Sequence, residues 1–259
     1  MQNTVRTLLA CALTFGFSQG AAAQNTGWGD RAYINIGFGV EDGKTDFADS
    51  KPFAIYDETA TINSTSSFTS GGLLDVGVGV RIWRNLSVGA AYHQEANTSS
   101  TTLSGTVPHP IFFNSSRNVS LKVDGEERTE SAQHMVLGWT MPFGSKLDVT
   151  LFAGPSWFRL QQDVAALQTD AAGTPRLSEA APFTKVILNA TKETRKKSVM
   201  GYNAGFDVAY MAWQNDSVRL GVGGFLRYTS ATAKILMLTK ELETTVGGIQ
   251  FGFGGRVRF

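Results

Sequence analysis

Histidine and glutamate side chains on one face of a strand could transfer protons or bind a metal ion. His93 and Glu95 have the same parity in a stretch of alternating polarity, and His134 has the matching parity in the next such stretch. Two imidazoles and one carboxylate approach the ligand set of a catalytic zinc site or an acid–base pair. They are too few and too loosely spaced to specify either. We therefore expect a hydrogen-bonded polar network with no metal, no cofactor and no catalytic residue.

A basic cluster could bind phosphate groups. Lys192, Arg195, Lys196 and Lys197 lie within six residues of one another. Lysine and arginine bind phosphate oxygens well, so this segment could hold a lipid phosphate. A solvated loop edge would have the same composition, and the sequence leaves both interpretations open.

Composition excludes several classes of protein. The chain has 259 residues, with 23 Lys+Arg, 22 Asp+Glu and a net charge of +1, which excludes a basic nucleic-acid binder. The single cysteine, Cys11, lies in the N-terminal segment, which excludes a disulfide framework. The 28 Gly, 17 Phe and 7 Pro form an unusual set for a soluble domain.

Residues 1–23 have the pattern of a secretory signal peptide. Arg6 supplies the positive charge, residues 7–17 are mostly apolar, and Ala21-Ala22-Ala23 forms a cleavage site before Gln24. We expect export, followed by one domain over residues 24–259.

Downstream of Gly27, the chain alternates strictly between bulky apolar residues and small or polar ones. This period of two predicts β-strands with two different faces. The pattern recurs in eight stretches: 31–41, 74–82, 86–95, 134–141, 147–157, 202–210, 218–229 and 249–259. The fold class is therefore predicted to be all-β.

The connections between these stretches alternate in length. Tight turns lie at residues 84–85, 142–146 and 214–216, whereas 41–67, 97–127, 161–195 and 232–244 are long and polar. Short turns at one end and long loops at the other are typical of a transmembrane β-barrel. We expect an eight-stranded antiparallel barrel, with both termini at the periplasmic turn end and the long loops extracellular.

The small and polar face carries acids and bases in similar numbers, which suits a closed interior where charges neutralise one another. In the hairpin centred on Asn215, we expect Asn203 to face Arg227 and Asp207 to lie near an arginine. The predicted interior network comprises Arg31, Glu41, Asp75, Arg81, His93, Glu95, His134, Asp148, Asn203, Asp207, Arg219, Arg227, Arg256 and Arg258.

The apolar face ends in aromatic residues at two levels, as expected where a barrel wall crosses two membrane–water interfaces. Near the loop ends these predicted girdles comprise Tyr92, Trp157, Tyr202 and Tyr228, and near the turn ends Trp139, Tyr210 and Phe259.

Two motifs carry a resemblance to the eight-stranded outer-membrane barrels of Gram-negative bacteria, the OmpA- and OmpX-like superfamily. The stretch 75–92, DVGVGVRIWRNLSVGAAY, resembles the family's Gly-rich hairpin. Phe251, Phe253, Val257 and the terminal Phe259 resemble the assembly signal read by the barrel-insertion machinery. The resemblance implies an outer-membrane location but does not carry an activity.

These observations favour a monomeric barrel with a structural or surface-interaction role. A narrow or lateral passage for small solutes is the alternative. A lipid-modifying enzyme is less favoured: barrels that deacylate lipid A resemble one another in a His-Ser pair, whereas His109 precedes Pro110 and His134 precedes Met135. A G-x-S-x-G motif is also absent. The expected partners are outer-membrane lipid, lipopolysaccharide among its components, and the insertion machinery, with no nucleic acid.

Overall fold

The computed structural model describes residues 29–42, 45–68, 71–236, 238 and 241–259, and every regular element in them is a β-strand. The predicted signal peptide, 1–23, lies outside the described residues. No helix in the described part of the chain is long and apolar enough to cross a membrane.

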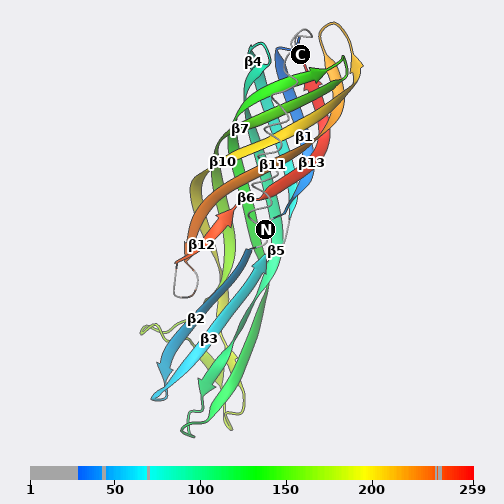
Figure 1. The fold of residues 1–259 in the computed structure, drawn as a ribbon. Coiled ribbons are helices and arrows are strands. Elements are labelled where there is room, and N and C mark those ends of the chain that lie inside the picture. Colours follow the sequence, from blue (N-terminus) through cyan, green and yellow to red (C-terminus); the bar gives the residue numbers. More distant parts are fainter. Residues whose placement is uncertain (1–28, 43–44, 69–70, 237, 239–240) are drawn as a thin grey trace, which may run out of the picture.

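Eight antiparallel strands pair side by side into a closed ring (Figure 1). In order around the ring, they are β1 (Ala32–Asp42), β4 (Gly72–Trp83), β5 (Leu86–Pro108), β6 (Ser116–Phe143), β7 (Leu147–Leu167), β10 (Ala190–Gln214), β11 (Arg219–Leu236) and β13 (Ile249–Arg258). The ring closes where β13 pairs with β1, with Phe253 opposite Phe38. The predicted eight-stranded antiparallel barrel is therefore confirmed.

The ends of the ring differ as the connection lengths predict. At one end, which carries the C-terminus in Figure 1, short turns join β4 to β5, β6 to β7 and β10 to β11. The Phe259 amide donates to the Ala32 carbonyl at 2.9 Å, so the start of β1 and the last residue meet at this end.

The predicted long polar loops are, however, mostly strands. β5, β6, β7 and β10 run far beyond the ring, and the other elements are β2 (Thr45–Ile55), β3 (Glu58–Phe68), β8 (Leu177–Glu179), β9 (Val186–Leu188) and β12 (Glu241–Val246). We call residues 45–68, 97–128, 162–200 and 231–246 the distal extension. The prediction of loops at 41–67, 97–127, 161–195 and 232–244 is wrong because Ser and Thr hide a period of two.

The period of two is visible in the burial of the side chains, which alternate between buried and exposed along these strands. Ala60 and Ile62 alternate with threonines in β3, and Leu103 and Val107 alternate with polar residues in β5. Threonine is β-branched and favours strands, so its abundance is compatible with extended hairpins.

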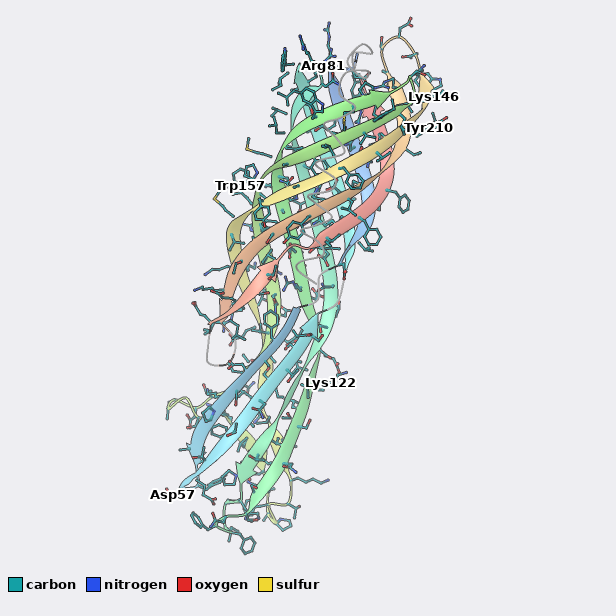
Figure 2. All side chains as sticks on the ribbon, viewed as in Figure 1. Asp57, Arg81, Lys122, Lys146, Trp157 and Tyr210 are labelled. Carbon is teal, nitrogen blue, oxygen red and sulfur yellow. The ribbon has the colours of Figure 1, made fainter. Side chains whose placement is uncertain are left out.

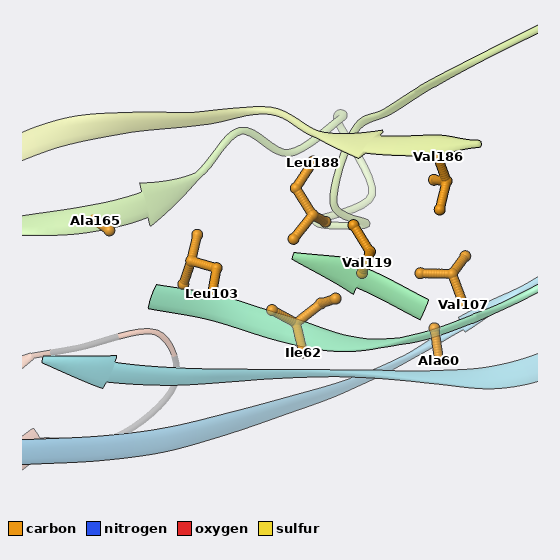
Figure 3. Close-up of a cluster of buried hydrophobic side chains, with 8 residues drawn as sticks. All are labelled: Ala60, Ile62, Leu103, Val107, Val119, Ala165, Val186 and Leu188. Carbon is orange, nitrogen blue, oxygen red and sulfur yellow. The ribbon is translucent and has the colours of Figure 1, made fainter. Parts of the chain in front are cut away.

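An apolar core fills the distal extension (Figure 3). It comprises Ala60, Ile62, Leu103, Val107, Val119, Ala165, Val186 and Leu188. A second apolar cluster comprises Ala132, Phe158, Leu160, Val164, Ala231, Ala233, Ile235 and Val246. The extension is thus packed like a small domain, which distinguishes it from a set of solvated loops.

Candidate functional site

The barrel interior is a column of ion pairs and hydrogen bonds, and its first level lies at the short-turn end. Arg219 donates to Asp148 at 2.9 Å and to Asp30, with an Nε–Oδ2 distance of 3.0 Å. Asp30 precedes β1 and Asp148 belongs to β7, so this arginine links strands on opposite sides of the ring.

The second level is centred on Asp207. The Arg256 guanidinium donates to Asp207 Oδ2, at 2.9 Å from Nε and 2.5 Å from Nη2. Its Nε also donates to Oδ1. Arg258 lies 3.8 Å from Oδ1 and donates to Asn35 at 2.6 Å. All four side chains come from the small and polar parity, so alternation places them inside the ring, and the strand register brings them together.

Tyr33 belongs to this level, although the sequence interpretation did not select it. Arg258 lies 5.1 Å from the centre of its ring, a cation–π contact. A Cβ atom at Gly79 or Gly89 would come within 2.5 Å of Tyr33 atoms, so these glycines make room for the ring. Tyr33 shares the parity of Asn35 and Glu41, which was the available signal.

The third level joins Arg227 to Asp75 at 2.5 Å and to Gln250 at 3.3 Å. The guanidinium also lies 5.2 Å from the centre of the Phe225 ring. Arg227 belongs to β11 and Asp75 to β4, two strands that are not neighbours in the ring.

The two interior histidines form the fourth level. His93 Nδ1 lies 2.7 Å from His134 Nε2, and His134 Nδ1 lies 2.7 Å from Ser156 Oγ. Asn203 donates to the same Ser156 oxygen at 3.0 Å. The order Ser–His–His is that of a nucleophile and a base, but Ser156 is fully buried, so an acyl substrate has no access to it.

The fifth level is acidic. Glu41, Glu95 and Glu130 are all buried, and Glu95 stands directly opposite Glu130 in the β5–β6 ladder. Arg128 lies 3.4 Å from Glu130 and donates to Gln162 at 3.2 Å. Glu130 continues the inward parity of His134 beyond the stretch recognised as a strand, which is why the sequence interpretation missed it.

The interior predicted from sequence is largely where it was expected. Of the fourteen predicted residues, Arg219 and Arg81 are half-buried, Arg31 is exposed at the short-turn end, and the others are buried. The prediction that Arg31 lies inside is wrong, because Arg31 precedes β1 and lies at the rim of the ring. Asn203 faces Thr229 and not Arg227, because Gln214 pairs with Arg219, so the turn is centred between Asp216 and Ser217 and not on Asn215.

Side chains fill the ring. Among the described residues, the cavity at the second and third levels has a volume of about 50 Å³ and is lined by Tyr33, Asp75 and Arg227 among others. This is room for a few water molecules. Phe158 covers the histidine level, with ring centres 6.3 Å from His93 and 6.1 Å from His134.

The outer face of the ring is apolar, with aromatic side chains at two heights (Figure 2). All seven predicted girdle residues are exposed. At one height, the ring centres of Tyr202 and Tyr228 lie 6.2 Å apart. Figure 2 shows Tyr210 near the short-turn end and Trp157 further along the barrel. Trp83, Phe143 and Trp213 are further exposed aromatics beside the short turns; Phe143 had been assigned to a turn, and the other two lie between a predicted strand and its turn.

The tip of the distal extension is apolar and exposed. Ile111, Phe112 and Phe113, in the β5–β6 turn, expose 66%, 63% and 72% of their surface. The turn is held by Asn114, whose amide hydrogen-bonds Glu58 at 3.3 Å, and by His109, which accepts from the Ile111 and Phe112 amides.

The basic cluster lies on β10 within the distal extension. Lys192 donates to the Gly125 carbonyl at 2.7 Å, and Arg195 pairs with Glu193 at 2.5 Å. Lys196 and Lys197 are exposed. The four residues thus do not form one phosphate clamp.

A closed ring of eight strands, with a charged interior and an apolar outer wall, defines the fold of the outer-membrane β-barrels. No family model and no curated protein matches the chain. The outer membrane protein OprG of Pseudomonas aeruginosa is similar in structure, with a TM-score of 0.51 and 11% identity over 89% of this chain and 96% of that chain.

A second similar structure is Ail, the attachment invasion locus protein of Yersinia pestis, solved with the heparin analogue sucrose octasulfate. Its TM-score is 0.35, with 12% identity over 87% of this chain and 99% of that chain. The likeness to OprG shows the fold, and it supports an outer-membrane location.

Proposed function

We propose that this protein is a surface-interaction barrel: the ring anchors it in the outer membrane, and the distal extension presents an apolar tip outside the cell. The observation that carries this proposal is the extension itself. Strands β5, β6, β7 and β10 continue from the ring into the extension without a break, and the extension has a packed core of its own. A rigid support lowers the entropy cost of binding at its end.

The tip has the composition of a contact surface. Three consecutive large apolar side chains are exposed at Ile111–Phe113, on a turn fixed by hydrogen bonds to Glu58 and His109. Exposed apolar patches of this kind mark binding sites for proteins or membranes. The proposed partner therefore presents an apolar surface.

The orientation is part of the proposal. The apolar outer wall of the ring suits lipid, and the polar distal extension suits water. The short-turn end and both termini are then periplasmic. We propose the barrel-insertion machinery as the partner during assembly, through Phe251, Phe253, Val257 and Phe259, and a monomer as the final state.

Lipopolysaccharide is the proposed lipid contact at the outer interface. A groove of about 560 Å³ lies on the wall here, lined by Tyr92, Trp157 and Arg159 together with Ser198 and Met200. Arg159 lies two residues beyond the girdle residue Trp157, at the height where lipid phosphates are expected.

The proposal is tested by replacing the tip. Cells that display the wild-type protein should adhere to hexadecane droplets more strongly than cells with Ile111, Phe112 and Phe113 changed to Ser. The matched control changes Ile187 to Ser, another exposed apolar residue of the distal extension. Equal adhesion of the wild-type and triple-variant cells at equal surface levels would remove the tip from the function.

A second candidate, lateral passage of small apolar solutes, is favoured by one observation. Within the described residues, β10 pairs with β11 only as far as Tyr202 and Ser230, and β11 continues with β12 instead. The wall is thus unpaired beside an apolar cluster. A disulfide between cysteines placed at Met200 and Thr232 would close this gap. Unchanged solute uptake in the closed variant would reject passage here, while leaving the tip proposal untouched.

A further inference from the structure

The fourth and fifth levels of the barrel interior together contain the atoms of a metal site. One ligand atom each of Glu41, His93 and Glu130 lies within 4.8 Å of the other two. These residues come from β1, β5 and β6 and expose 3%, 0% and 2% of their surface. From these contacts we propose that the cluster binds one divalent transition-metal ion, with zinc as the best fit.

Three carboxyl groups meet at the fifth level, so it needs either a bound proton, as a hydrogen bond between two carboxyl groups requires, or a cation. Glu41, Glu95 and Glu130 lie together, and Glu41 is in hydrogen-bond contact with Glu95. Arg128 pairs with Glu130, whereas Arg227 is already engaged by Asp75. Like charges directly opposite in a ladder are destabilising, and buried charges need a counter-charge. A divalent ion supplies it.

An unsatisfied oxygen at the same place supports the assignment independently. Glu130 Oε1 is buried and has no hydrogen-bond partner, although Oε2 of the same carboxylate faces Arg128. A buried carboxylate oxygen of this kind is costly, and metal coordination is one way to satisfy it.

In one of its two hydrogen-bond directions, the histidine relay leaves His93 in the tautomer that a metal needs. If Ser156 Oγ accepts from His134 Nδ1, then His134 Nε2 accepts from His93 Nδ1, and the lone pair of His93 is left on Nε2. A ligating histidine characteristically donates its other N–H to a fixed acceptor. The amide nitrogen of Gln250 lies 3.3 Å from His93 Nε2 and 2.6 Å from Glu41. The ion would displace this amide from the two ligand atoms.

The ligand chemistry selects the ion. One imidazole with two carboxylates suits zinc, manganese or iron(II), whereas magnesium and calcium prefer oxygen ligands alone. In a tetrahedral zinc site with bonds of about 2.0–2.1 Å, ligand atoms are about 3.4 Å apart, so from separations within 4.8 Å the ligand atoms would close by at most about 1.4 Å. The ion would tie three strands together where the ring meets the distal extension.

The test titrates the refolded full-length barrel, treated with EDTA and held in detergent, with zinc sulfate, manganese chloride or magnesium chloride. We expect one zinc per chain and weak or no magnesium binding. His93→Gln and Glu130→Gln should each weaken zinc binding on the order of tenfold or more. Glu126→Gln, at a buried carboxyl outside the cluster, and His109→Gln should leave the affinity unchanged.

Two results would overturn the site. One is the absence of zinc binding by the folded wild-type protein, as judged by its faster gel migration without heating. The other is wild-type affinity in folded His93→Gln and Glu130→Gln. If these variants do not fold, manganese-induced broadening of histidine NMR signals in the wild-type protein decides the question. Broadening at His93 and His134 supports the site, and broadening confined to His109 rejects it.

Discussion

Arg227 on β11 and Asp75 on β4 form an ion pair of 2.5 Å across the barrel, although two strands separate them in the ring. Neither side chain exposes more than 7% of its surface. Interior charges are therefore neutralised by ion pairs that cross the lumen, and not only by pairs between adjacent strands. In so small a barrel, such pairs occupy the lumen.

Asp207 is the most connected acid of this interior, since Arg256 and Arg258 both face it. Changing Asp207 to Leu would leave two buried arginines without their shared partner. We expect a loss of about 3–5 kcal/mol in the free energy of unfolding, measured by urea titration of the barrel in lipid vesicles. Glu243→Gln breaks the exposed pair with Lys234 and should cost less than about 1 kcal/mol. An Asp207→Leu barrel as stable as the control would contradict the network.

Phe259 lies at the end of the strand pairing that closes the ring. Its backbone pairs with Ala32, and its ring is exposed on the lipid-facing side. We expect deletion of Phe259 to lower sharply the amount of folded protein in the outer membrane, with refolding into detergent much less affected. Phe253→Leu, which has the same parity and keeps the terminal residue, serves as the control. If the deletion variant assembles in cells at the wild-type level, the assembly-signal interpretation is wrong.

Glu126 gives the distal extension a pH dependence. Burial raises the pKa of this carboxyl, against the opposing effect of the hydrogen bond from Thr101. Because the folded pKa lies above the unfolded one, ionisation costs stability, and the cost disappears as the pH falls below the unfolded value. Glu126→Gln should therefore be at least as stable as wild type at pH 8, and its relative advantage should shrink towards pH 4. Parallel stability curves for the two proteins would show that Glu126 is not perturbed.

The packed interior should conduct poorly. Five levels of side chains occupy the ring, and the described cavity of about 50 Å³ is too small for a water-filled channel. We expect no large steady conductance from the purified protein in planar bilayers. The double change Asp207→Ser and Arg256→Ser, which removes the central ion pair of the second level, should raise it. Large steady currents through the wild-type barrel would reject a filled interior.

The alternation of apolar and polar residues predicted the ring well. In a strand of a membrane barrel, successive side chains point alternately to the lipid and to the interior. The alternation located the lipid-facing aromatics and most interior charges, including Asp75, Asp207 and Arg256. It failed where composition was given more weight than parity. Ile62, Leu103 and Val119 bury a core that Ser- and Thr-rich segments concealed.

Contacts across the lumen were beyond the reach of the sequence. The β10–β11 turn is centred between Asp216 and Ser217 and not on Asn215, so the predicted partner of Asn203 was wrong. Glu130 was missed because its strand was ended too early. The pairing of Arg227 with Asp75 depends on ring curvature, which no local pattern specifies.

Orientation of the distal extension is the central claim, and surface labelling of intact cells tests it most directly. Cys11 lies in the predicted signal peptide, so a single cysteine can be placed at Phe112, on the exposed tip, or at Ser145, in a short turn. A maleimide that cannot cross membranes should label Phe112→Cys in intact cells, and label Ser145→Cys only after the outer membrane is opened. Labelling of Ser145→Cys but not Phe112→Cys in intact cells would contradict the account.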